Sequence, residues 1–381
     1  MYKVLFLLLW GLVFSYSGFA QSLGGICGKK IQQKKFLKIQ NKYATGYSIK
    51  RYKGFYLLTI KKTWDKATEP QHIFLVENAL NFPSTCQNFF NIKIPVKKVA
   101  SLSTTHLPAI DLLGELKTVA AFSNLKFAYN EKIKKSEKNG EVFELGSPPS
   151  SERLLALQPD VIFSYSTTDP RVEGLGSLIS LKLPMAYISE FREKHPLARA
   201  EWLKVFGLFY NKLDLAKKKF REIEAKYNEV TEVALQTRPK KRVLVGELSK
   251  NVWKAPGGAS DLVTLITDAG GEYIWSENKS ETTLSINVEK ALIDSAAAEI
   301  WLPQNMHKSK KELLSNELYK TLNIVENISI YNNVRRLGEG GGNDYWETAL
   351  MRPDLLIQDL LKIFHPILIP GHDLIWYKQL D

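Results

Sequence analysis

Several features on which enzymes depend are missing from this sequence. It has only two cysteines and six histidines, and the histidines, at 72, 106, 195, 307, 365 and 372, lack the spacing of a zinc site. There is no G-x-S-x-G elbow, and no P-loop or G-x-G-x-x-G follows a predicted strand. We therefore expect no enzymatic activity, no bound cofactor and no protein-held metal, with a secreted hydrolase as the distant alternative.

Long apolar runs are equally scarce, and the only one of note lies at the start. A short positive start is followed by an apolar run at 4–14 and by Gly18-Phe19-Ala20, whose outer residues are small. This is the layout of a cleaved secretory signal at 1–20, and the run is too short to favour a membrane span. A retained anchor is the alternative. The sequence thus predicts export to the periplasm.

The even number of cysteines, Cys27 and Cys86, predicts one disulfide in an oxidising compartment. Closing a loop of about sixty residues would stabilise the fold by roughly 4 kcal/mol. Metal binding by the pair is one alternative. A lipid anchor on Cys27 is another, although the large Ile26 is a poor residue to precede such a site.

Length and charge narrow the class further. The roughly 360 residues that remain after cleavage exceed one ordinary core and favour two lobes. The net charge of +12 would suit nucleic acid, an anionic ligand or a charged surface. A secretory signal argues against nucleic acid, and the basic residues look scattered, with the densest runs, 216–226 and 308–311, typical of solvated helix faces.

The order of predicted elements indicates how the lobes are built. Residues 21–94 form a β-rich extension with strands at 47–52, 55–61 and 72–77. Strands and helices then alternate in an N-terminal lobe at 95–195, as in a parallel sheet covered on both faces. The predicted strands of this lobe are 96–102, 119–122, 161–164 and 185–188, and its helices are 107–113, 151–157 and 172–180.

One long amphipathic pattern separates this lobe from a second one. Apolar residues recur at near-helical spacing through 196–236, and Arg238-Pro239 ends the pattern. A helix of about 35 residues spans about 50 Å, which suits a strut at 196–237 between two lobes. In the C-terminal lobe, 238–381, we predict strands at 243–248, 299–302 and 327–331 and helices at 261–268, 288–295 and 354–364.

Four segments together carry a family resemblance. They are KKVASLSTTHLPAIDLLGELKTVAAFS at 97–123, LLALQPDVIFSYS at 154–166, LITDAGGEYIW at 265–275 and GGGNDYWETALMRPDLLIQDLLKIFHP at 340–366. In this order the chain resembles, over roughly 95–366, the periplasmic binding proteins of iron-siderophore and vitamin B12 ABC importers. The resemblance implies two Rossmann-like α/β lobes bridged by one long helix, with ligand held in the cleft between them.

The same resemblance implies a function. The protein would bind a ferric siderophore as a monomer and deliver it to an inner-membrane ABC permease, with cobalamin or haem as alternative ligands. The metal, iron or cobalt, would belong to the ligand. The preference for a siderophore rests on cations expected to face negative ligand oxygens, namely Arg192, Lys254, Arg335 and Arg336.

Candidate site residues follow from the rule that ligands bind beyond the carboxyl ends of strands in open α/β sheets. In the N-terminal lobe these are Thr104, Thr105, His106, Tyr165, Glu190 and Arg192. Helix capping for the hydroxyls and ordinary packing for the tyrosine are the alternatives.

In the C-terminal lobe, the rule selects Trp253 and Lys254 after strand 243–248. It also selects a glycine-rich loop, in which glycines let backbone approach a ligand closely. Burial of Trp253 in its own lobe and packing of Trp346 at the seam are the alternatives. The candidates in the glycine-rich loop are Arg335, Asn343, Tyr345 and Trp346.

The last two candidate residues are surface glutamates, which are expected to contact the permease. In the resembled family, one acidic residue on each lobe docks on permease arginines. By position these are Glu173, after the SYS strand, and Glu289, in the segment SINVE. Carboxylates facing fixed arginines set orientation well.

Overall fold

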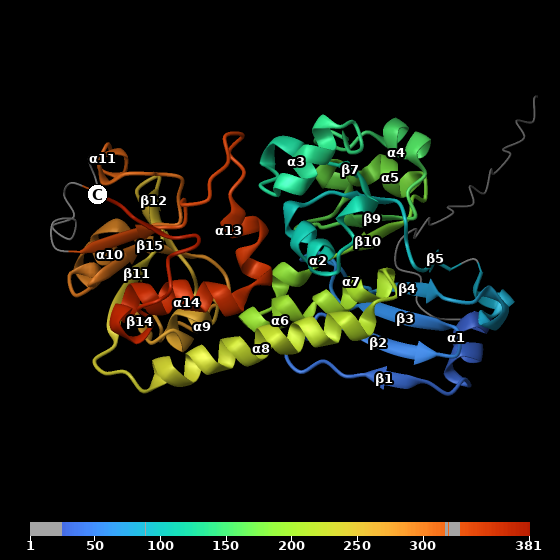
Figure 1. Cartoon of the computed structure of the whole chain (residues 1–381), viewed down its shortest axis with the longest axis horizontal. Coiled ribbons are helices and arrows are strands. Elements are labelled where there is room, and N and C mark those ends of the chain that lie inside the picture. Colours follow the sequence, from blue (N-terminus) through green and yellow to red (C-terminus); the bar gives the residue numbers. More distant parts are fainter. Residues whose placement is uncertain (1–24, 88, 317–318, 320–327) are drawn as a thin grey trace, which may run out of the picture.

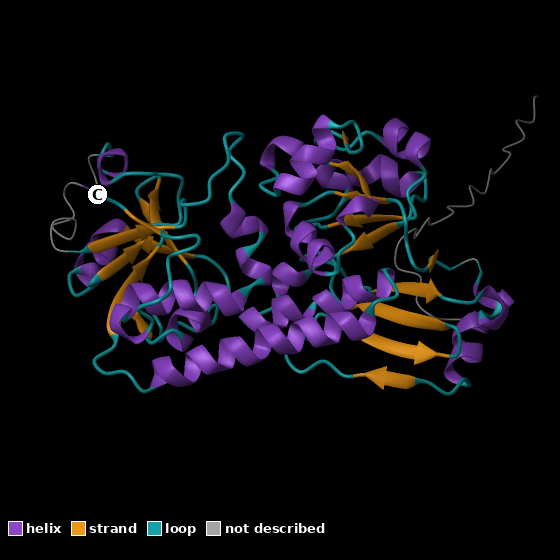
Figure 2. Cartoon of the chain, viewed as in Figure 1, coloured by secondary structure: helices purple, strands orange, loops and turns teal. Residues whose placement is uncertain are grey.

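The computed structural model describes residues 25–87, 89–316, 319 and 328–381. Two lobes stand side by side, a long helix runs beneath both, and a separate sheet lies under the N-terminal lobe (Figure 1). Helices and strands are mixed throughout, which confirms the α/β class (Figure 2). The predicted signal at 1–20 lies outside the described residues. Within the described part of the chain, no helix is long and apolar enough to cross a membrane.

The N-terminal extension is β-rich, as predicted. Its sheet has the order β1-β2-β3-β4-β5, and Gly54, with φ of +83°, makes the turn between the second and third strands. One face packs in the main core with the helices that follow the N-terminal lobe, and the other is covered by α1 (Gly25–Gln32). The strands are β1 (Leu37–Ile39), β2 (Tyr47–Tyr52), β3 (Phe55–Ile60), β4 (Gln71–Val76) and β5 (Asn91–Lys93).

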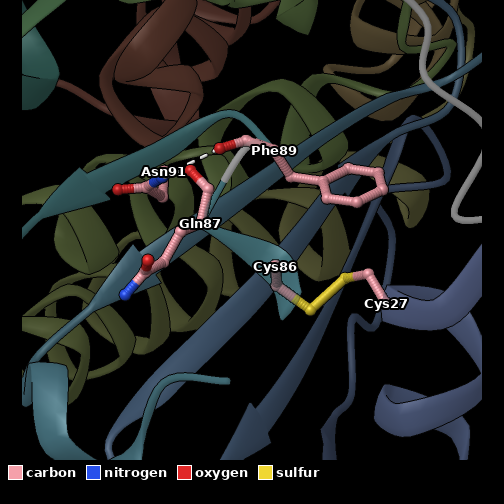
Figure 3. The surroundings of a disulfide bond; sticks show 5 residues. All are labelled: Cys27, Cys86, Gln87, Phe89 and Asn91. Carbon is pink, nitrogen blue, oxygen red and sulfur yellow. Dashed lines mark hydrogen bonds between the residues drawn. A yellow bond between two sulfur atoms is a disulfide. The ribbon is translucent and has the colours of Figure 1, made fainter. Parts of the chain in front are cut away.

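The predicted disulfide is confirmed. Cys27 on α1 is bonded to Cys86 (Figure 3). Both are buried in a cluster that includes Phe55 and Phe74. The side-chain amide of Asn91 donates to the carbonyl of Phe89 at 2.8 Å, which secures the segment after Cys86. The alternative of a lipid anchor on Cys27 would need the sulfur that this bond occupies.

The N-terminal lobe contains a parallel sheet of order β10-β9-β6-β7-β8, and all four predicted strands are present. The helix α3 was not predicted, because its sequence EKIKKSEK buries only Ile133. The strands are β6 (Val99–Ser101), β7 (Val119–Phe122), β8 (Phe143–Glu144), β9 (Val161–Ser164) and β10 (Met185–Tyr187), and the helices are α2 (Leu107–Leu112), α3 (Glu131–Lys138), α4 (Ser151–Leu157) and α5 (Gly176–Ser180).

The C-terminal lobe has a sheet of order β14-β11-β16-β17-β18, parallel except for its last strand. The predicted strand 243–248 is divided at Gly246, where a Cβ would lie 1.9 Å from the Lys254 carbonyl oxygen. The strands of this sheet are β11 (Lys241–Val245), β14 (Gly271–Tyr273), β16 (Ile300–Leu302), β17 (Ser329–Asn332) and β18 (Lys378–Gln379). A second, smaller sheet contains β12 (Glu247–Ser249), β13 (Val252–Ala255) and β15 (Leu284–Asn287). The helices include α9 (Asp261–Asp268), α10 (Val288–Ser295), α11 (Lys310–Leu313), α13 (Asp344–Glu347) and α14 (Pro353–Phe364).

The prediction of one continuous linking helix is wrong. The segment folds as α6 (Pro196–Glu201), α7 (Leu203–Phe209) and α8 (Leu213–Leu235). Asn211 adopts a left-handed φ of +53°, which ends α7 and lets the chain fold back so that α7 packs on α8. Gly207 permits this approach, because a Cβ there would lie 2.6 Å from the Cβ of Ala216. Only α8, about 34 Å long, runs beneath both lobes (Figure 1).

Two buried carboxylates attach the extension to this helical segment. Glu201, which is fully buried, accepts the backbone N–H groups of Lys42, Tyr43 and Ala44 and the ammonium of Lys204. The carboxylate of Glu193 accepts the next two N–H groups of loop 42–46 and the indole N–H of Trp202. The loop is therefore wrapped around two anions supplied by a distant part of the chain.

Replacing Glu201 by Ala should lower the free energy of unfolding by about 3–5 kcal/mol, because three N–H groups and a buried ammonium lose their acceptor. Urea unfolding of the full chain measures the loss. Glu222→Ala, which removes an exposed ion pair with Lys219 on α8, is the control and should cost at most about 0.5 kcal/mol. Equal small losses in both variants would contradict the anchoring role of Glu201.

Candidate ligand-binding site

A cavity of about 620 Å³ lies at the carboxyl ends of β6, β7 and β9 in the N-terminal lobe. The predicted residues Thr104 and Tyr165 are in its wall. Tyr165 is 43% exposed, and its ring meets Phe191 edge-on at 6.4 Å. Most of the polar lining consists of hydroxyls and amides, from Ser103, Thr104, Ser123, Asn124, Ser147, Tyr165 and Thr167.

A second cavity, of about 430 Å³, lies between α6 and the C-terminal lobe. Trp346 is 46% exposed in its wall, whereas Tyr345 is almost completely buried. Arg199 on α6 and Asp261 on α9, which form an ion pair of 2.7 Å, both lie in its wall. The remaining wall is largely apolar, with Pro196, Pro256, Leu262, Leu265, Ala349, Leu350, Pro353 and Leu356.

Residues predicted from opposite lobes do meet in the structure. The turn η3 (Thr104–His106) of the N-terminal lobe packs against α13 of the C-terminal lobe. Thr104 lines the first cavity, and Tyr345 and Trp346 line the second. The two cavities therefore border the same contact between the lobes.

The glycine-rich loop approaches the other lobe. A Cβ on Gly340 would lie 2.3 Å from the carbonyl oxygen of Lys126, and one on Gly342 equally close to that of Phe127. The carboxylate of Glu347 accepts the backbone N–H groups of Tyr129 at 2.7 Å and Asn130 at 3.0 Å. The expectation that glycine permits close approach is correct, but the partner is backbone of the N-terminal lobe.

The four cations predicted to face the ligand line neither cavity. Arg192 pairs with Asp65 of the extension and donates to the Thr167 carbonyl. Lys254 lies on β13 and donates to the Ser285 hydroxyl. Arg336 pairs with Asp344, and Arg335 is exposed. The cations that were expected to bind a strongly anionic ligand therefore lie outside both cavities.

Three further candidates are buried, which corrects their expected role as cavity walls. Trp253 is 1% exposed and packs on Trp301, as the alternative interpretation had it. His106 is fully buried, so burial lowers its pKa to about 3 and keeps the ring neutral. Asn343 caps α13 through the N–H of Tyr345. In the described chain, no group of three or more His, Cys, Asp or Glu side chains could hold a metal ion.

Some polar residues near the site were missed or misjudged from sequence. Glu190, a predicted contact, is nearly buried, and burial raises its pKa, with Thr105 and Arg199 close by. Arg199 was not singled out because it lies in the predicted strut. Gln304, in the wall of the second cavity, directly follows strand β16 and Pro303, so the strand-end rule could have found it.

The two proposed docking glutamates differ in their surroundings. Glu173 accepts hydrogen bonds from Ser166, Thr167 and Thr168. Burial alone would raise the pKa of Glu173, but these hydrogen bonds lower it to about 2. Glu289 is exposed in the first turn of α10. Of these two glutamates, Glu289 is therefore the one whose carboxylate is exposed without an intramolecular hydrogen bond among the described contacts.

Comparison with known proteins identifies the class. The family described as periplasmic binding protein matches residues 99–337, which is more than half of the chain, and the protein belongs to this family. It is therefore a binding protein of the ABC-importer type. An uncharacterized lipoprotein of Methanocaldococcus jannaschii is 27% identical over 300 residues, covering 74% of this chain and 69% of that protein.

Solved structures share the two-lobed fold at low identity. A periplasmic binding protein from Veillonella parvula covers 81% of this chain and 98% of its own, with 12% identity and a TM-score of 0.56. The triscatecholate siderophore binding protein of Bacillus subtilis covers 72% and 95%, with 18% identity and a TM-score of 0.53. A periplasmic heme binding protein from Pseudomonas aeruginosa covers 75% and 98%, with 13% identity and a TM-score of 0.51.

The contact of Glu347 across the lobes should respond to pH. Burial raises its pKa to about 7; the charge of Asp344 also raises this pKa, and the charge of Lys134 lowers it. A folded pKa above the unfolded value of about 4.3 means that the stabilisation is complete at low pH and is lost as pH rises through about 7. The loss should be on the order of 2 kcal/mol.

Urea unfolding of the wild type and of Glu347→Gln at several pH values between 5 and 8 tests this. The wild type should lose stability relative to the variant as pH rises, because the amide does not titrate. A stability difference that stays constant across this range would show that Glu347 does not titrate there.

Proposed function

We propose that this protein captures a ferric siderophore of low net charge, of the hydroxamate type, between its lobes and delivers it to an inner-membrane ABC permease. Export by the segment 1–20 and a monomeric state are part of the proposal. The lining of the two cavities is the observation that carries it. Their volumes, about 620 and 430 Å³, suit bulky small molecules.

The charge of the lining decides between siderophore classes. A ferric tricatecholate carries several negative charges, which fixed cations must balance in a partly dry cleft. Arg199 is the only Lys or Arg in the described linings, and it is already paired with Asp261. Hydroxyls and amides instead suit the carbonyl and N–O oxygens of a neutral hydroxamate complex.

A corrinoid is the second candidate. Tyr165 and Trp346 each present a half-exposed aromatic face to a cavity, which suits a large flat ligand. Haem is a third candidate. The buried ring of His106 is not available as an axial ligand, but the exposed Tyr165 in the first cavity could serve as one.

Titration of intrinsic tryptophan fluorescence with a ferric hydroxamate, a ferric catecholate, cyanocobalamin and haem tests the proposal. Saturable quenching by the hydroxamate is expected, and saturation by the catecholate alone would overturn the charge argument. Turnover of a chromogenic ester with no binding would favour the hydrolase alternative.

Trp346→Ala should weaken binding of the hydroxamate by roughly 5- to 30-fold, because an aromatic wall is lost. Isothermal titration calorimetry measures the affinity without relying on the deleted fluorophore. Phe36→Ala removes an aromatic of matching exposure, 47% against 46%, outside both cavities, and should bind normally. Unchanged affinity in Trp346→Ala would remove this residue from the site.

For docking, we propose that Glu289 is the C-terminal-lobe contact with permease arginines. Glu173 is the matching N-terminal-lobe residue by resemblance, although its carboxylate is engaged within its own loop. Glu289→Lys should leave ligand affinity unchanged and reduce uptake at least about tenfold, because like charges then face each other at the contact. Glu232→Lys, an exposed reversal on α8, is the control. Normal uptake in Glu289→Lys would exclude the assignment.

A further inference from the structure

The positive charge of this protein is concentrated in its N-terminal extension and not scattered along the chain. Residues 25–64 contain eleven Lys and Arg and no acidic residue. Residues 25–94 hold thirteen basic and three acidic residues, so ten of the +12 net charges of the chain lie there. The two lobes are therefore close to neutral, and the excess charge belongs to one part of the surface.

Strand pairing brings like charges together in this region. In the β1–β2 register, Lys38 is directly opposite Lys50. Directly opposed like charges destabilise an antiparallel pair, since their Cβ atoms are about 5 Å apart. Within the described residues, no carboxylate forms an ion pair with either lysine. Such an arrangement is stabilised when an external anion covers it.

Large apolar side chains are exposed among these charges. Phe36 is 47% and Leu37 is 64% exposed, and both lie within the sequence KKFLK at 34–38. The ammonium of Lys50 lies 4.7 Å from the centre of the Phe36 ring. Aromatic and aliphatic side chains flanked by lysines are the combination that enters the interface of an anionic bilayer.

We propose that this surface docks the protein on a bilayer rich in anionic phospholipids. The surface, here called the basic face, consists of Phe36 and Leu37 with Lys29, Lys30, Lys34, Lys35, Lys38 and Lys50. Figure 1 shows α1 and β1 at the end of the molecule away from the C-terminal lobe. None of these residues lines either cavity, so docking leaves the ligand site uncovered.

The exposed apolar side chains of Phe36 and Leu37 favour a lipid surface over other polyanions as the partner. A duplex nucleic acid or a sulfated polysaccharide would be held by the lysines alone, through its phosphates or sulfates. Phe36 and Leu37 contribute nothing to such a contact but add buried apolar area in a bilayer interface. The inference is independent of which ligand occupies the cavities.

Co-sedimentation of the disulfide-bonded chain, residues 21–381, with vesicles tests the proposal. Binding is expected to mixed phosphatidylglycerol and phosphatidylcholine vesicles, to be absent from pure phosphatidylcholine, and to fall steeply as salt is raised to about 0.5 M. The combined variant Lys34→Gln, Lys35→Gln, Lys38→Gln should partition about a hundredfold more weakly, at roughly fivefold per lysine. The single variant Leu37→Ser should also weaken binding, compared with the unmodified protein at the same salt concentration.

The matched control removes the same number of charges elsewhere. Lys217→Gln, Lys218→Gln, Lys219→Gln on α8 has the same net charge and should bind vesicles like the unmodified protein. Ligand titration should be unaltered in both triple variants, since all six lysines lie outside the cavities. Neither variant should unfold at a lower temperature than the unmodified protein, and Lys38→Gln should stabilise the β1–β2 pair because it removes a like charge opposite Lys50. Equal losses in both, equal binding to neutral vesicles, or binding to single-stranded DNA without binding to vesicles would each overturn the proposal.

Discussion

The buried face of α8 is the constraint on which the arrangement of this molecule depends. Its first half, where Ala216 meets Gly207, packs on α7 and the extension, and its second half packs on α14 and α9 of the other lobe. The hydroxyl of Tyr227 reaches Asp268 at 2.6 Å within this second half. Because an α-helix of 23 residues resists bending, the separation of the lobes is set by one rigid element. The buried residues of that face are Leu213, Ala216, Phe220, Ile223, Tyr227, Val230 and Ala234.

Polar contacts then decide how the lobes and the extension sit on this frame. Glu193 and Glu201 hold the loop 42–46 by its N–H groups, and Glu347 holds the N-terminal lobe in the same way. In each case a side-chain carboxylate satisfies backbone donors that a loop cannot pair by itself. The two cavities border the contact between η3 and α13, the helix that carries Glu347.

The excess positive charge of this protein lies away from its two cavities. The cavity walls consist mostly of hydroxyls, amides, aromatic rings and apolar side chains, and their charged groups are Glu173, Arg199, Asp261 and Glu281. Nearly all of the excess positive charge lies on the extension. A carrier must release its ligand. Recognition by hydrogen bonds and apolar contacts avoids the large free-energy cost of desolvating the charges of a buried ion pair. The proposed contact with an anionic surface would therefore be made by cations that lie outside both cavities.

Sequence by itself determined the elements whose pattern is local. The strands β7 and β9 and the helices α4, α9 and α10 have the predicted bounds, because side-chain periodicity and capping residues such as Ser150 and Ser260 act over a few residues. The number of cysteines was sufficient to predict their bond. Tertiary structure alone decided the rest: the reversal at Asn211, the burial of Trp253, the pairing of Arg192 with Asp65, and the approach of Gly340 to Lys126. Each depends on a partner far along the chain, and neither residue type nor spacing specifies which distant group will be there.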